Sequence, residues 1–143
     1  MVKRTTGKRV DRSQASKYAE AGRVFLESAR ALADLADESA PYGNAIGLLS
    51  IHAAISYTDA LTIAFGEKKS TGEHGKATDT LRAILGSKVD DKQVKFLNQV
   101  LLQKDTVSYQ GHFYPLEDGR RLLEKTEAYC QWARDTFETR GRE

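Results

Sequence analysis

The sequence predicts an all-α protein, built as an up-and-down bundle of four or five helices. Only two prolines occur in 143 residues, and the strong helix formers alanine, leucine, glutamate, lysine and arginine are abundant. Apolar residues recur at three- and four-residue steps, which is the spacing of one helix face. Glycine and proline divide the chain into five helical segments with short connections, so neighbouring helices should be antiparallel. We find no segment with the alternating pattern of a strand.

The first predicted helix begins near Ser13, because serine often caps a helix N-terminus. Its apolar face includes Phe25 and Leu32, which lie about two helical turns apart. The helix should end near Ser39, since Pro41 disfavours helical geometry in the residue before it.

The second predicted helix lies within YGNAIGLLSIHAAISYTDALTIAFG, the most apolar part of the chain. Its alanines, glycines and serines allow neighbouring helices to approach closely, so we expect it at the centre of the bundle. Gly66 stands where a glycine commonly caps a helix C-terminus. The polar segment EKKSTGEHGKA that follows is expected to be a loop.

Three more helices complete the predicted bundle. A short one covers about residues 76–85 and ends at Gly86. The next begins near Asp90 or Asp91, because an acidic side chain is favourable at the positive end of a helix dipole. After a polar loop, the last helix begins near Leu116.

We expect residues 13–139 to form one domain. A chain of this length can bury roughly two thirds of its unfolded surface, so it needs neither disulfide nor metal to fold. Cys130 is the only cysteine, which excludes an internal disulfide and suits a reducing cytoplasm. No apolar run reaches the ~20 residues that span a bilayer. The sequence therefore predicts a soluble cytoplasmic protein with no membrane partner.

Residues 1–12, MVKRTTGKRVDR, form a basic arm before this domain. Five cationic side chains occur there against one acid, Asp11. Two interpretations are open. The arm is either a disordered, solubilising terminus or a basic segment that contacts phosphates.

One stripe of the apolar second helix carries polar side chains. His52, Ser56, Asp59 and Ile63 follow one another at steps of four, three and four residues, so they share a helix face. This stripe is either a buried hydrogen-bonded cluster, a solvent-facing stripe, or the wall of a polar cleft.

The loops hold the remaining candidates. His74 precedes a helix N-terminus that could receive an anion, although a histidine can also close a loop by bonding its backbone. Lys104 either relieves the carbonyls that end the fourth helix or binds a ligand, and Tyr109 is either an apolar plug or a ligand contact. His112 could act as an acid or base near neutral pH. The sequence has no GxxxxGK or HExxH motif and no metal-ligand spacing, so no cofactor or metal is expected.

The order of these elements resembles HEPN domains, the higher eukaryotes and prokaryotes nucleotide-binding family, over about residues 13–137. Three segments carry the resemblance, namely AIGLLSIHAAISYTDALTIAFGEK, STGEHGKATDTLRAIL and LLQKDTVSYQGHFYPLEDGRRLLEKTEAYCQWA. The resemblance implies a homodimer. In catalytic members it implies a metal-independent ribonuclease whose arginine is followed four to six residues later by a histidine.

This chain departs from that catalytic motif. Lys104 occupies the arginine position and Tyr109 the histidine position. Lysine keeps the positive charge but loses the planar fork that holds a phosphate through two hydrogen bonds. The ending His112-Phe113-Tyr114 is similar to that of HEPN proteins that work with nucleotidyltransferases, so such a partner is also implied.

The function predicted on this basis is non-catalytic binding of a nucleotide, RNA or a protein partner, in a toxin–antitoxin or defence context. Its ligand-binding residues would be Asp59, His74, Lys104 and Tyr109. One alternative is a metal-independent ribonuclease toxin that uses Lys104 and His112 in a displaced motif. A second alternative is an interaction subunit without a small-molecule site.

Overall fold

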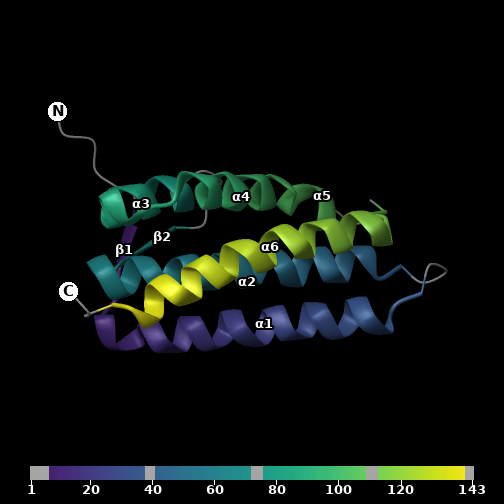
Figure 1. Ribbon diagram of the computed structural model, residues 1–143, viewed down its shortest axis with the longest axis horizontal. Helices are drawn as coiled ribbons and strands as arrows, with labels where there is room; N and C mark the ends of the chain where they lie inside the picture. The colour runs from purple at the N-terminus through teal and green to yellow at the C-terminus, as the bar shows by residue number, and fades with distance from the viewer. Residues whose placement is uncertain (1–6, 38–40, 72–75, 109–112, 141–143) are drawn as a thin grey trace.

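The computed structural model describes residues 7–37, 41–71, 76–108 and 113–140 (Figure 1). Most of these residues are helical, which confirms the predicted all-α class. In chain order the elements are β1 (Gly7–Arg9), the 3-10 helix η1 (Arg12–Gln14), α1 (Ala15–Leu35), α2 (Gly43–Gly66), β2 (Lys68–Ser70), α3 (Lys76–Leu85), the 3-10 helix η2 (Gly86–Lys88), α4 (Asp91–Leu102), α5 (Lys104–Ser108) and α6 (Leu116–Glu138).

The helices run along one long axis in four alternating passes. Helix α1 makes the first pass, α2 returns, and α3, α4 and α5 follow one another end to end as the third (Figure 1). Helix α6 returns beside α2. This is the up-and-down bundle that the sequence predicts, with its third pass divided into three short helices.

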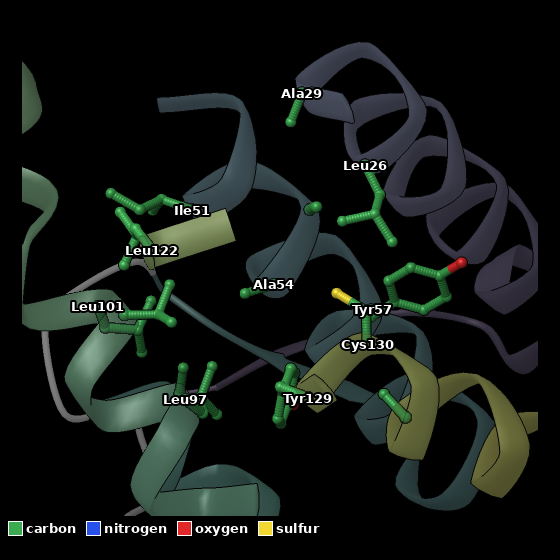
Figure 2. Packing of buried hydrophobic residues seen from close by; sticks show 14 of the residues in the cluster. Leu26, Ala29, Ile51, Ala54, Tyr57, Leu97, Leu101, Leu122, Tyr129 and Cys130 are labelled. Atoms are coloured by element: carbon green, nitrogen blue, oxygen red, sulfur yellow. The ribbon is translucent and has the colours of Figure 1, made fainter. Parts of the chain in front are cut away.

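Helix α2 forms the centre of the core, as predicted. Its Ile51 and Ala54 are fully buried and lie between leucines of α1, α4 and α6 (Figure 2). By length and composition α2 could cross a membrane, but 67% of its most apolar window is buried inside the bundle, as in a core helix. At its start, a Cβ on Gly43 would lie 1.9 Å from the carbonyl oxygen of Tyr114, so the chain entering α6 touches the α2 backbone.

Several predicted helix boundaries agree with the structure. Helix α3 covers residues 76–85 as expected, and Gly86 follows it with a φ of +55°. Asp90 caps α4, and its side chain accepts a hydrogen bond of 2.9 Å from the backbone N–H of Lys92. Helix α6 begins at Leu116. Local signals fix these ends, which is why the sequence predicts them.

Helix α1 ends at Leu35, four residues before the expected Ser39. The next residue, Ala36, has an extended backbone with a ψ of 140°. The guanidinium of Arg120 on α6 donates hydrogen bonds to the carbonyls of Ala33 (2.8 Å) and Ala36 (3.2 Å). A side chain from the last helix therefore satisfies the end of the first one, and no local signal in the sequence predicts this.

The predicted loop after α4 begins instead as a short helix, so Lys104 starts α5 rather than ending the fourth helix. Val107 is buried because α5 packs against α2 at Gly47, where a Cβ would lie 2.8 Å from Val107 Cγ1. Asn44 of α2 holds both sides of the connection. Its amide donates to the carbonyl of Val107 (3.0 Å), and its side-chain oxygen accepts from the N–H of Tyr114 (2.9 Å).

Two short strands are the other departure from the prediction. Strand β1 pairs with β2 as an antiparallel ribbon at the end of the bundle where α2 ends and α3 begins (Figure 1). Residues 7–12 of the basic arm thus form β1 and the turn that leads into η1, which begins at Arg12. The arm is held because the N–H of Val10 donates to the carbonyl of Glu67 (3.0 Å). Glu67, rather than Gly66, takes the left-handed conformation that ends α2, with a φ of 52°.

Candidate nucleic-acid interface

The two strands bring four cationic side chains together. Lys8 stands directly opposite Lys69, and Arg9 stands opposite Lys68. Directly opposed residues of an antiparallel pair have side chains on the same face, and like charges there destabilise the pair. We call Lys8, Arg9, Lys68 and Lys69 the basic ribbon. Successive residues of a strand point to opposite faces, so Lys8 and Lys69 lie on one face of the ribbon and Arg9 and Lys68 lie on the other.

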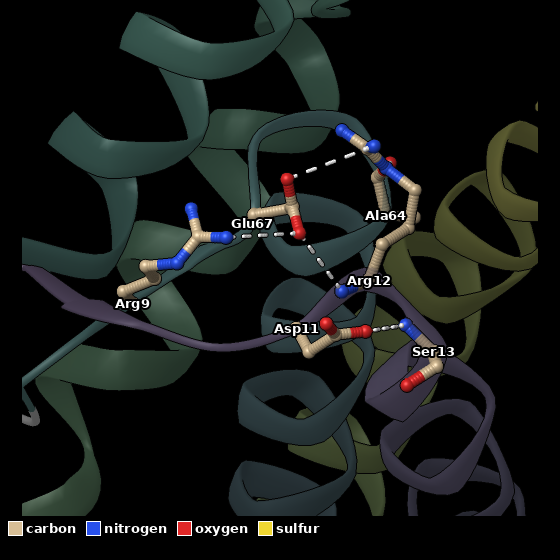
Figure 3. A network of polar contacts seen from close by, with 6 residues as sticks. All are labelled: Arg9, Asp11, Arg12, Ser13, Ala64 and Glu67. Atoms are coloured by element: carbon tan, nitrogen blue, oxygen red, sulfur yellow. Dashed lines mark hydrogen bonds and ion pairs between the residues drawn. The ribbon is translucent and has the colours of Figure 1, made fainter.

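A polar network fixes the ribbon to the C-terminal end of α2 (Figure 3). The Nε of Arg12 donates to the carbonyl of Ala64 (2.7 Å), where a cation also opposes the negative end of the helix dipole. Glu67 pairs with Arg12 (3.8 Å) and with Arg9 (3.6 Å), and it accepts from the backbone N–H of Arg12 (3.3 Å). The ribbon is therefore attached to the core helix and presents its cations at a defined place.

The chain turns from the ribbon into η1 at Asp11. Its carboxylate accepts a hydrogen bond of 2.9 Å from the N–H of Ser13, and bonding to Ser13 lowers the pKa of Asp11. The nearby Arg9 and Arg12 lower this pKa further. Ser13, the predicted helix cap, thus lies inside the capped turn, and α1 itself begins at Ala15.

Two ribbon cations are open to a ligand. The Arg9 side chain is 76% exposed, and its ion pair with Glu67 is long. Exposed pairs of this kind contribute only about 0–1 kcal/mol, so a phosphate could displace it. Lys8 is exposed and has no ion-pair partner among the residues that the structure describes. Lys69 is more enclosed, with its ammonium 5.3 Å from the centre of the Tyr18 ring.

Asp59, a predicted site residue, lies on α2 with only 7% of its surface exposed. Burial raises its pKa from 3.8 to about 6, and the positive charge of Lys69 opposes that rise. The carboxylate is thus a buried negative charge that interacts with Lys69 of the ribbon. Ile63, on the same helix stripe, is fully buried, so this part of the stripe belongs to the interior.

Lys104, a second predicted site residue, has a different neighbour. It begins α5 and is half-buried, and its charge acts on His52 of α2. Burial lowers the pKa of His52, and Lys104 lowers it further. The His52 ring also packs on Phe25 of α1, with ring centres 5.5 Å apart. Lys104 and Asp59 both lie in the part of the chain that the structure describes, and no ion pair joins them.

The other predicted candidates, His74, Tyr109 and His112, lie outside the described residues. A buried hydrogen bond that the sequence analysis did not identify joins α2 to α6. The hydroxyls of Thr58 and Tyr129 bond to each other, and Thr58 also donates to the carbonyl of Ala54 (2.7 Å). Burial raises the pKa of Tyr129, which therefore stays neutral.

A surface cleft of about 350 Å³ lies between the end of α4 and the start of α6. It is built from the segment around the predicted loop and is lined by Gln99, Leu102, Gln103, Tyr114, Asp118, Arg121, Leu122 and Lys125. Arg121 already pairs with Glu117 and, at 3.4 Å, with Asp118. Leu102 is 61% exposed, so the rim of this cleft is partly apolar. Two cations and one acid line it, so its net charge favours an anion less than that of the basic ribbon.

Within the described parts of the chain, no group of three or more histidine, cysteine, aspartate or glutamate side chains could hold a metal ion. Comparisons with protein-family models, curated proteins and solved structures found no match for this chain. The geometry and charge of the basic ribbon therefore carry the functional argument.

Proposed function

We propose that this is a non-catalytic, HEPN-like helical protein that binds RNA through the basic ribbon. The observation that carries the proposal is the direct opposition of Lys8 to Lys69 and of Arg9 to Lys68. A phosphate backbone placed along either face of the ribbon would meet one such pair of cations and release its own counterions. Binding of this kind depends on charge and needs no base-specific contact.

The occupant is proposed to be RNA rather than DNA because the helix order resembles the HEPN family. The same resemblance supports three further proposals: a homodimer, a nucleotidyltransferase partner and a role in toxin–antitoxin or defence systems. A cytoplasmic location is proposed because the lone Cys130 suits a reducing compartment. A dimer would be detected as a doubled mass in light scattering, and a monomer at all concentrations would remove that proposal.

Fluorescence anisotropy with a labelled single-stranded RNA tests the function. We expect saturable binding by the wild type and clearly weaker binding by the double variant Lys8→Gln/Arg9→Gln. The matched control is Lys92→Gln/Lys95→Gln, which removes two exposed cations from α4. A parallel titration with single-stranded DNA of the same sequence tests the preference for RNA. Equal binding by the two double variants would contradict the proposal, and no binding by the wild type would favour the interaction-subunit alternative.

One observation favours the ribonuclease alternative enough to test it. His52, neutral because its pKa is lowered, lies within the electrostatic influence of Lys104. A neutral imidazole can accept a proton from a ribose hydroxyl, and an ammonium can stabilise the charge that develops on the phosphate. The wild type and the variants His52→Gln, Lys104→Ala and His112→Ala would be incubated with RNA in EDTA. Intact RNA with the wild type would exclude this alternative.

A further inference from the structure

A second cationic site lies on another face of the bundle. A cleft of about 160 Å³ runs between α1 and α6, with α2 beneath it. Arg23 and Arg30 of α1 and Arg134 of α6 line it, together with Tyr57 of α2. We call these four residues the arginine cleft. None of them belongs to the basic ribbon, and the sequence analysis did not identify any of them.

Tyr57 has a hydroxyl without a hydrogen-bond partner among the described residues. The residue is only 4% exposed, and its ring lies beside Leu26 and Cys130 (Figure 2). The ring also fills the space above Gly22, where a Cβ would lie 2.7 Å from Tyr57 Cδ2. The hydroxyl oxygen is not fully enclosed, so it reaches the solvent of the cleft and is free to donate to a ligand there.

The three arginines line the same cleft as Tyr57. Burial, with a smaller contribution from Cys130, raises the pKa of Tyr57. The positive charges of Arg134, Arg23 and Arg30 all act in the opposite direction. Guanidinium groups from both walls of the cleft therefore lie in the neighbourhood of Tyr57.

Two of the arginines keep free donors. The Nε of Arg30 donates to Glu127 (2.5 Å), and the Nε of Arg134 donates to Glu138 (3.2 Å). No other hydrogen bond from either guanidinium occurs within the described residues, so both terminal amino groups remain available. Arg23 differs, because it donates from all three of its nitrogens to Glu20 and Glu27.

We propose that the arginine cleft binds one tetrahedral oxyanion of the phosphate type, which accepts hydrogen bonds from Tyr57, Arg30 and Arg134. The cleft, at about 160 Å³, is too small for a drug-sized or nucleotide-sized ligand, whose sites measure about 300–1,000 Å³. A single small anion is therefore the expected occupant. Three arginines and two glutamates line the cleft, and Glu20 and Glu138 beside it also pair with these arginines, so net charge does not favour an anion. Directional hydrogen bonds from the tyrosine and the free guanidinium donors must therefore supply the selectivity.

Titration calorimetry with inorganic phosphate, at constant ionic strength set with sodium chloride, tests this site. We expect saturable binding by the wild type and at least about fivefold weaker binding by Tyr57→Phe, since one donor to a charged acceptor is lost. Tyr57→Phe removes only a hydroxyl without a protein partner, so the variant should fold normally. Arg134→Gln should weaken binding by a similar factor.

Two controls separate this cleft from other cationic sites. Arg82→Gln removes an arginine of α3 that is ion-paired with Asp91 (2.9 Å), and it should bind phosphate as the wild type does. Lys8→Gln/Arg9→Gln should also retain phosphate binding, so the result is independent of the RNA-binding proposal.

Titration with methyl phosphate tests which form of phosphate the cleft binds. Tighter binding than free phosphate would support an esterified phosphate as occupant, and weaker binding would support the free ion. No saturable binding of either ligand, or equal binding by Tyr57→Phe and the wild type, would overturn the proposal.

Discussion

The basic ribbon and the arginine cleft both present cations, but they differ in how those cations are neutralised. In the ribbon, lysine and arginine side chains face one another, and Glu67 is the carboxylate that pairs with Arg9. In the cleft, each guanidinium already has a carboxylate partner on its own or a neighbouring helix. The ribbon therefore offers excess charge, which suits a polyanion. The cleft offers aligned donors, which suit a single small anion.

Reversing the charge of the ribbon should have the largest effect. In Lys8→Glu/Arg9→Glu, phosphate contacts are lost and repulsion replaces them, so RNA affinity should fall on the order of 100-fold, or about 2.7 kcal/mol. Anisotropy at fixed salt measures this fall. Phosphate binding in the arginine cleft should stay unchanged in the same variant. If both activities fell together, the two regions would not be separate sites.

Removing the buried charge beneath the ribbon should have the next largest effect. The folded pKa of Asp59 is about 6 and the unfolded value is close to 4, so the folded state holds an extra proton between these pH values. The free energy of unfolding contributed by Asp59 therefore decreases as pH rises from about 4 to about 6, and is constant above that range. Asp59→Asn should stabilise the protein by about 1–2 kcal/mol above pH 7, because a buried charge is removed.

Urea unfolding of the wild type and Asp59→Asn across this pH range measures both effects. In the variant, the decrease in the free energy of unfolding that Asp59 causes between about pH 4 and about pH 6 should be absent. A variant less stable than the wild type at pH 8 would show instead that the carboxylate is held by favourable contacts.

Tyr129→Phe should act on the bundle and leave both anion sites intact. It deletes the hydroxyl that bonds to Thr58, while Thr58 keeps its bond to the carbonyl of Ala54. The expected loss is about 0.5–1.5 kcal/mol of unfolding free energy, with RNA and phosphate affinities unchanged. Urea denaturation gives the first quantity. A change in either affinity would mean that the sites depend on this part of the core.

Glu67→Gln should produce the smallest changes. Protein stability should fall slightly, whereas RNA affinity should rise. The substitution removes the carboxylate that pairs with the exposed side chains of Arg9 and Arg12, and both pairs are long, so stability should fall by about 1 kcal/mol or less. RNA affinity should rise about twofold to threefold, because Arg9 becomes available and a negative charge is removed. Weaker RNA binding by this variant would show that Glu67 holds the ribbon in its binding geometry.

The parts of the fold that follow from local residue chemistry could be predicted from the sequence. The bounds of α3 and the cap at Asp90 depend on residues within a turn of the helix end. The central position of α2 follows from its apolar composition. The end of α1 could not be predicted, because Arg120 reaches it from α6. The ribbon could not be predicted either, because its three-residue strands are too short to show an alternating pattern.

The same distinction holds for the candidate sites. Asp59 could be singled out as a candidate because an acid stands out in an apolar helix. The structure buries it, and the positive charge of Lys69 acts on its carboxylate. The basic arm that holds Lys8 is visible in the sequence, whereas Lys68 belongs to a segment predicted only as a polar loop, and the pairing of the two depends on the fold. Tyr57 was not identified, since a tyrosine on a core helix looks like any other apolar residue until its hydroxyl is placed.

The dependence of RNA affinity on salt tests the central claim most directly. For a single-stranded ligand, the logarithm of the association constant should fall by about 0.7 per phosphate contact for each tenfold increase in salt. If the two open ribbon cations, Lys8 and Arg9, make these contacts, the wild-type slope should be about −1.4, and Lys8→Gln/Arg9→Gln should bring it close to zero. The same slope for the wild type and this variant would contradict the assignment of RNA binding to the ribbon.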